Sequence, residues 1–119
     1  MFVVYIHPKC STCKRALDWL TRHGIPHRIE SIRERPPSIA ELGEALRLMN
    51  GRILSLFNTS GMDYRSMNLR DRLPGMDTEE ALRLLYSNGM LVKRPFLIGR
   101  GIALAGFKPE VWKDTFAKT

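Results

Sequence analysis

Apolar and β-branched residues fill positions 2–6, the sequence FVVYI, without a charged residue among them. Such a short run, ended by a His-Pro-Lys segment, is typical of a buried strand. Apolar side chains then recur at helical spacing over residues 13–20, until Gly24 and Pro26 end the helix. Residues 27–32 alternate between polar and apolar, as a second strand does, before two prolines. Strand, helix and strand in this order predict a βαβ unit with parallel strands.

The middle of the chain, residues 38–88, carries mainly helical patterns. A capping-box pattern that starts at Ser38 opens the first of these helices. Residues 64–73 form a second, highly charged helical candidate. A third is expected over residues 79–86, with Asp77 as its N-terminal cap.

The last third returns to strand patterns. Residues 96–98 and 102–105 are two short apolar runs around a glycine-rich turn, which predicts a hairpin. Pro109 is well placed to open a terminal helix. The whole order predicts an α/β domain over residues 1–119: a thioredoxin-like fold with a four-stranded mixed sheet. The helical insertion, about residues 38–88, then separates its βαβ and ββα halves.

Length and composition are those of one globular domain, with 119 residues of which 44% are hydrophobic. No apolar run approaches the roughly 18 residues that a membrane span needs. The N-terminus has neither a basic segment nor a cleavage site, so we expect a cytoplasmic protein without membrane contact. We also expect a monomer. In a reducing compartment, a close cysteine pair is more often catalytic, redox-sensing or metal-binding than a permanent disulfide.

The charge balance is basic, with 19 Lys and Arg against 12 Asp and Glu and a net charge of +7. This excess favours an anionic ligand, such as a thiol-bearing oxyanion, or an acidic protein partner. An ordinary solvated surface accounts for the excess equally well, because the basic residues are scattered. No aromatic residues interleave with them as platforms for bases, so direct nucleic-acid binding is not expected.

The two cysteines of the chain, Cys10 and Cys13, stand together at the start of the first helix. The unpaired N–H groups and positive dipole end of that helix favour thiolate over thiol at Cys10. Cys13 lies one turn further on the same face and can reach back to Cys10. We therefore expect Cys10 to attack and Cys13 to resolve.

Three alternatives to redox chemistry are open. Structural zinc takes four ligands, and beside the cysteines the chain offers only His7, His23 and His27, the last two beyond the helix. A structural disulfide that closes so short a loop would add little stability. Two inert core cysteines are the third alternative, although Cys10 follows an exposed-looking Pro-Lys pair. The redox interpretation is the strongest of the four.

Four segments, CSTCKRALDWL, FNTSGMDYR, GMLVKRP and GFKPEVW, together resemble the ArsC/Spx family of bacterial proteins. The resemblance spans essentially the whole chain. It implies a thioredoxin-like fold, with a cis-proline loop at Pro95 that faces the cysteine. One branch of the family consists of glutaredoxin-linked arsenate reductases. Another consists of Spx regulators, which bind the α-subunit of RNA polymerase and sense oxidants through a CxxC pair.

The resemblance carries over unevenly. Cys10 and the Arg94–Pro95 pair match the arsenate reductases, which generally lack a cysteine at the position of Cys13. Those enzymes also use further arginines, where this chain has Leu54 and a residue of the 102–104 strand. The resemblance therefore implies a thiol-disulfide oxidoreductase acting on a small oxyanion or a mixed disulfide. Glutathione with glutaredoxin, or thioredoxin, would be the reductant, with no bound cofactor or metal; an Spx-type regulator is the alternative.

Arg94 is the main candidate for substrate binding besides the cysteines. The residue before a proline is held extended, so its side chain would be aimed. A guanidinium matches an oxyanion or a thiolate-bound adduct, although a plain surface charge is the alternative. Arg65 is a weaker candidate for the same work. His7 is expected to be a loop residue rather than an acid–base catalyst.

Overall fold

The computed structural model describes residues 1–118. Its centre is a four-stranded sheet in the order β2-β1-β3-β4. The strands are β1 (Phe2–Ile6), β2 (His27–Ser31), β3 (Phe96–Gly99) and β4 (Ile102–Ala105). β1 and β2 pair in parallel, whereas β3 pairs antiparallel with both β1 and β4. The predicted βαβ unit, hairpin and mixed sheet are thus confirmed.

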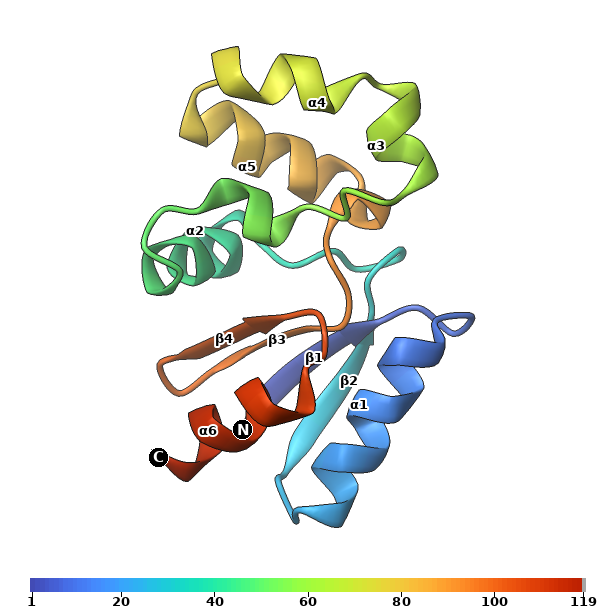
Figure 1. Ribbon diagram of the computed structural model, residues 1–119, viewed down its shortest axis with the longest axis vertical. Coiled ribbons are helices and arrows are strands. Elements are labelled where there is room, and N and C mark those ends of the chain that lie inside the picture. The colour runs from blue at the N-terminus through green and yellow to red at the C-terminus, as the bar shows by residue number, and fades with distance from the viewer. Residues whose placement is uncertain (119) are drawn as a thin grey trace.

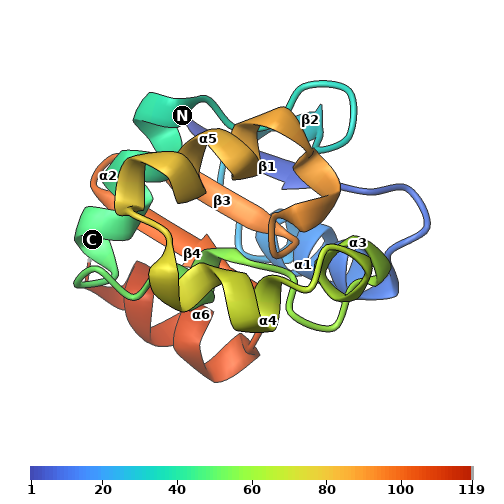
Figure 2. The ribbon, with the colours of Figure 1, turned by 90° about the horizontal axis from the view of Figure 1, so that it is seen from above.

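The sheet separates two layers of helices (Figure 1). α1 (Ser11–Arg22) and α6 (Pro109–Ala117) cover one face, and the insertion between β2 and β3 covers the other. Figure 2 looks down through this insertion onto the strands. Side chains of β1 alternate between the layers, because Phe2 and Val4 belong to the core beside α1 and α6, and Tyr5 to the core beneath the insertion.

The insertion consists of short helical pieces. These are α2 (Ile39–Leu48), η1 (Ile53–Leu56), α3 (Met62–Ser66), α4 (Leu69–Arg72), η2 (Leu73–Gly75), α5 (Thr78–Ser87) and η3 (Gly89–Leu91). The capping box that opens α2 is confirmed, with reciprocal hydrogen bonds of 3.0 Å between Ser38 and Glu41. Asp77 also caps α5 as predicted, since its Oδ1 accepts from the backbone N–H of Glu80 over 2.8 Å.

One predicted helix is wrong. Residues 64–73 do not form a continuous helix, because Asn68 adopts a left-handed conformation with φ 53° between α3 and α4. Asparagine tolerates that conformation better than most residues, and a right-handed helix cannot pass through it. The break lets Tyr64 and Leu69 both reach the core.

The insertion is tied to the sheet at two places. Tyr5 Oη donates to Glu41 Oε1 over 2.7 Å, which joins β1 to α2. Burial and this hydrogen bond raise the pKa of Tyr5 well above its usual range. Gly89 lies so close to the chain after β2 that an added Cβ would be 1.7 Å from the carbonyl oxygen of Ile32.

Within residues 1–118 there is no helix of the length and apolar character that a bilayer crossing requires.

Candidate functional site

Cys10 is the N-terminal cap of α1. Its backbone is extended, with φ −96° and ψ 108°, and its Sγ accepts a hydrogen bond from the backbone N–H of Cys13 over 3.2 Å. The sulfur therefore takes the place where a capping oxygen or an anion usually sits, at the positive end of the helix. Cys10 is half-buried, so a reagent can reach it.

Cys13 lies in the opposite environment, with no exposed surface. Burial first, and then a hydrogen bond to the Cys10 side chain, raise its pKa to about 12. Cys13 is thus a neutral thiol at physiological pH. Both cysteines are free, so the pair is in its reduced form with one accessible and one protected sulfur.

His7 belongs to the loop that leads to Cys10. Its Nδ1 accepts a hydrogen bond from the backbone N–H of Lys9 over 3.2 Å. Burial, followed by the charges of Arg94, Arg33 and Lys9, lowers the pKa of His7. His7 thus lies in a loop, as predicted, and its Nδ1 is already bonded to the backbone.

Arg94 and Pro95 lie where the insertion returns to the sheet, and the peptide bond between them is cis, as the resemblance implied. The preceding segment is held by the hydrogen bond from the Lys93 N–H to the carbonyl of Leu56 over 2.8 Å. Arg94 is half-buried, with Nη1 3.9 Å from Met90 Sδ. Arg94 lines one hollow together with Thr12, which lies between the two cysteines in the sequence. Its positive charge helps to lower the pKa of His7 and partly opposes the rise that burial causes in the pKa of Cys13.

Two hollows meet at Arg94. One, of about 440 Å³, lies towards the insertion and includes Arg33, Asn58 and Asn88 in its lining. The other, of about 520 Å³, lies towards α6 and includes Thr12 of α1. Neither Cys10 nor Cys13 is among the lining residues of these two hollows, and Thr12 is the lining residue nearest to them in the sequence. The loop before α1 and helix α3 lie on the same side of the molecule, the right-hand side, in both ribbon views (Figures 1 and 2).

Arg33 is a further candidate for the site, which the sequence did not single out. It lines the same hollow as Arg94, and both arginines act on His7. A signal was present in the sequence, because the predicted parallel strands end together. Ile6 pairs with Ser31, so the residues just after β1 and β2 necessarily meet at one edge of the sheet.

Arg65 is exposed on α3. Its neighbours Gly61, Met62 and Asp63 line the hollow towards the insertion, but Arg65 does not.

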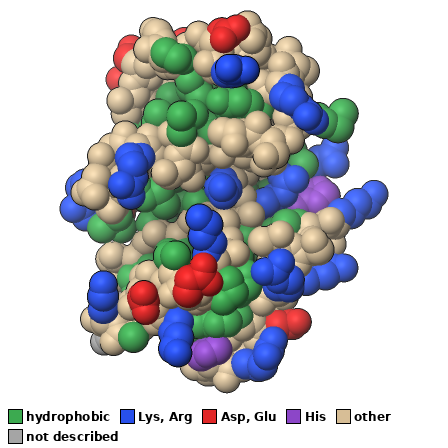
Figure 3. Space-filling model, in the orientation of Figure 1, with side chains coloured by type: hydrophobic (Ala, Val, Ile, Leu, Met, Phe, Trp, Pro, Cys, Tyr) green, Lys and Arg blue, Asp and Glu red, His purple; other side chains and the backbone are tan. Residues whose placement is uncertain are grey.

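Within residues 1–118, no group of three His, Cys, Asp or Glu side chains could hold a metal ion. Lys and Arg side chains are spread over the face seen in Figure 3 rather than gathered in one block.

Comparison with known proteins agrees with this geometry. The sequence pattern of the ArsC family matches residues 5–115. An uncharacterized Bacillus subtilis protein, YusI, is 40% identical over 113 residues, which cover 95% of this chain and 96% of that protein. The global transcriptional regulator Spx of Bacillus subtilis is 26% identical, over 92% of this chain and 82% of the regulator.

Solved structures give the same result. A possible arsenate reductase from Streptococcus mutans is 34% identical, with a TM-score of 0.86 over 95% of this chain and 98% of that one. A protein from Bacteroides fragilis, described as related to the ArsC family, is 37% identical, with a TM-score of 0.88 over 95% of each chain. The chain therefore belongs to the ArsC family.

Proposed function

We propose that this protein is a thiol-disulfide oxidoreductase of the arsenate reductase-like kind, with Cys10 as nucleophile and Cys13 as resolving thiol. The observation that carries the proposal is the asymmetry of the pair. Cys10 is accessible and its sulfur accepts an N–H at the helix N-terminus, whereas Cys13 is buried and protonated. Such a pair supports two successive steps, each with its own nucleophile.

In the first step, the Cys10 thiolate attacks one sulfur of a mixed disulfide. The bond between the two substrate sulfurs breaks, one substrate thiolate leaves, and a Cys10 mixed disulfide forms. In the second step, Cys13 loses its proton and attacks Cys10 Sγ, which releases the remaining substrate thiol. The substrate is reduced by two electrons and the protein is left with a Cys10–Cys13 disulfide.

Arg94 would bind negative charge on the substrate. Its guanidinium is half-buried, and its charge already reaches both Cys13 and His7. A preorganised donor of this kind stabilises the charge that develops in the transition state. Pro95, in the cis-bonded pair, would form the wall opposite the cysteines. A small oxyanion such as arsenate is the second substrate class that this charge favours.

A reductant must regenerate the two thiols. Glutathione with glutaredoxin, or thioredoxin, supplies the required two electrons, and each is found in the cytoplasm, where we expect the protein to work. The test is a turnover panel in which arsenate and a glutathione mixed disulfide are each offered with either reductant. Turnover that disappears in Cys10→Ser supports the proposal, and absence of turnover with every combination contradicts it.

An Spx-type regulator is the second candidate, favoured by the CxxC pair and by the similarity to the Bacillus subtilis regulator over 92% of this chain. In that case the partner would be the α-subunit of RNA polymerase, and oxidation of the pair would change its affinity. A pull-down with the purified α-subunit, run on reduced and oxidised protein, distinguishes the two. Capture without turnover favours the regulator, and turnover without capture favours the enzyme.

A further inference from the structure

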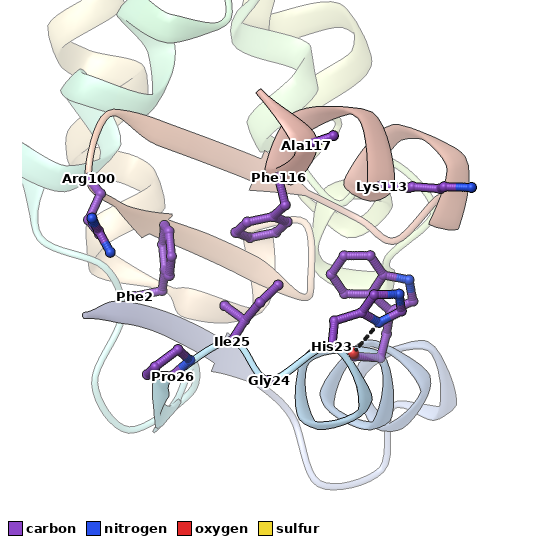
Figure 4. Close-up of a pocket in the computed structure, with 10 residues that line it drawn as sticks. Phe2, His23, Gly24, Ile25, Pro26, Arg100, Lys113, Phe116 and Ala117 are labelled. Carbon is purple, nitrogen blue, oxygen red and sulfur yellow. Dashed lines mark hydrogen bonds between the residues drawn. The ribbon is translucent and has the colours of Figure 1, made fainter. Parts of the chain in front are cut away.

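A second concave site lies at the end of α1 that is remote from the cysteines. It is a groove of about 520 Å³ between the C-terminal ends of α1 and α6 and the turn that joins β3 to β4 (Figure 4). None of its lining residues lines the two hollows at Arg94. The groove is therefore separate from the proposed redox site.

Aromatic rings form much of the lining of this groove. Phe116 packs edge-on against Phe2, with ring centroids 5.2 Å apart, and lies 5.6 Å from Trp19. Trp19 in turn is stacked on His23, at 4.0 Å between centroids. His23 Nδ1 is 2.8 Å from the carbonyl oxygen of Trp19, which fixes the imidazole on the indole. Phe2 is itself buried, whereas Trp19 and Phe116 are half-buried and His23 is exposed. These three rings offer an aromatic surface to another flat ring system.

Two cations flank the aromatic surface. Arg100 and Lys113 are exposed and stand at opposite ends of the groove in Figure 4, with Phe2 and Phe116 between them. The lining contains no Asp or Glu. Among residues 1–118, neither cation forms an ion pair, since the three ion pairs of that part of the chain involve other arginines. No acidic side chain of residues 1–118 therefore pairs with Arg100 or Lys113.

The turn that carries Arg100 is fixed by its backbone. Arg100 has φ 50°, a left-handed conformation, between two glycines of which Gly99 has φ 151°. A Cβ on Gly99 would lie 3.2 Å from Phe2 Cα, so the turn packs directly on β1. The close approach holds the backbone of Arg100 beside Phe2, and the Arg100 side chain extends from there at the Phe2 end of the groove (Figure 4).

We propose that this groove binds a small aromatic carboxylate. The rings of the groove bury a flat apolar body, and the fork of Arg100 matches the two oxygens of a carboxylate. The inference does not rest on the proposed redox function, because no cysteine or Arg94 atom takes part in it.

The binding test uses 2-naphthoate and its neutral isostere 2-naphthamide as probes on the full chain labelled with nitrogen-15. Naphthoate should shift the amide signals of Trp19, His23 and Phe116 in a saturable way, and leave those of Cys10 and Arg94 unchanged. The carboxylate should bind at least about tenfold more tightly than the amide, since charged hydrogen bonds are the stronger ones. Equal affinities, or shifts centred on another surface, would overturn the proposal.

Variants separate the specific role of the Arg100 guanidinium from attraction by the net positive charge of the protein. Arg100→Asn removes the guanidinium but suits the left-handed backbone, and should weaken naphthoate about tenfold. Arg100→Lys should recover part of the affinity. Arg35→Asn is the matched control, because Arg35 is exposed, lies outside the groove and carries the same charge. If Arg35→Asn weakens binding as much as Arg100→Asn does, the attraction is nonspecific and the assignment fails.

A Cys10→Ser variant keeps this experiment apart from the redox proposal. Naphthoate should bind it as it binds the unmodified protein, whether or not the unmodified protein turns over any disulfide or oxyanion. Oligomerisation is checked by sedimentation with and without probe. If the groove is instead occupied by a second copy of the chain, the protein will sediment as a dimer that naphthoate dissociates, and the small-ligand assignment is then wrong.

Discussion

The backbone N–H of Cys13 donates a hydrogen bond to Cys10 Sγ over 3.2 Å, so the residue that we propose as the resolving thiol itself helps to hold the proposed nucleophile. The two sulfurs nevertheless differ in accessibility, because Cys10 is half-buried and Cys13 has no exposed surface. An electrophile from solution must meet Cys10 first. In the proposed mechanism, packing as well as the helix dipole would therefore set the order of the two chemical steps.

Replacing either cysteine should stop the reaction at a different stage. Cys10→Ser should abolish turnover and reaction with a small disulfide. Cys13→Ser should still react once and then accumulate a stable mixed disulfide on Cys10, because the backbone N–H that contacts the sulfur is retained. Intact mass spectrometry after a brief exposure to glutathione disulfide measures both. An adduct on Cys13 in the Cys10→Ser protein, formed as fast as the Cys10 adduct, would contradict the assigned roles.

The resolving step should accelerate with pH throughout the neutral range. Burial is the largest cause of the high pKa of Cys13, about 12, and it persists when Cys10 is in a mixed disulfide. The attacking thiolate is then a minor species whose fraction rises about tenfold per pH unit below that pKa. Stopped-flow release of the second thiol between about pH 6 and 9 tests this. A rate that levels off within that range would show that Cys13 is far more acidic than its burial implies.

Arg94 and Arg33 should contribute unequally to turnover. Arg94→Ala should slow turnover about a hundredfold with folding intact, and Arg94→Lys should recover only part of it. Arg33 lines the same hollow but is exposed, so Arg33→Ala should cost about tenfold and the loss should shrink at high salt. Arg65→Ala is the comparison and should have a smaller effect than either. Initial rates of the three alanine variants are compared with that of the unmodified protein at low and at high salt. Full activity of Arg94→Ala would exclude this arginine from the site.

The sheet and its main connections could be predicted because their signals are local. The run at residues 2–6, the cap at Ser38 and the hairpin around Gly99 each depend on neighbours in sequence, and each is confirmed. The cysteine position was predictable for the same reason, since a cap is defined by the residues that follow it.

Features that depend on distant contacts were harder to predict. The break at Asn68 accompanies the packing of both Tyr64 and Leu69 into the core, and the residue pattern alone did not indicate it. Arg33 joins the site through the parallel register of β1 and β2, and the neighbouring basic residues gave no reason to choose it. The aromatic groove joins residues from both ends of the chain, so only the fold brings them together.

The link between β1 and α2 should contribute measurably to stability. Tyr5 Oη donates to Glu41 Oε1, the oxygen that also completes the capping box with Ser38. Tyr5→Phe keeps the ring in the core but removes the donor, and should lower the free energy of unfolding by about 1 kcal/mol. Chemical denaturation measures the change. Tyr86→Phe is the control and should be near neutral, because the Tyr86 ring is exposed.

The last prediction concerns Gly89, which positions the segment that carries Arg94. A Cβ at this glycine would lie 1.7 Å from the carbonyl oxygen of Ile32 and 3.3 Å from a side-chain carbon of Pro36. Only backbone movement can relieve the first contact, so Gly89→Ala should lower the free energy of unfolding by about 3 kcal/mol. Gly75→Ala is the matched control, because no atom lies within 4 Å of its added Cβ. It should leave stability unchanged or raise it slightly, since alanine restricts the unfolded chain.

Because η3 leads directly to Arg94, Gly89→Ala should also slow turnover under conditions where the variant is still folded. Denaturation curves and initial rates on both variants test the pair, and equal stability of the two would show that the chain after β2 yields without strain.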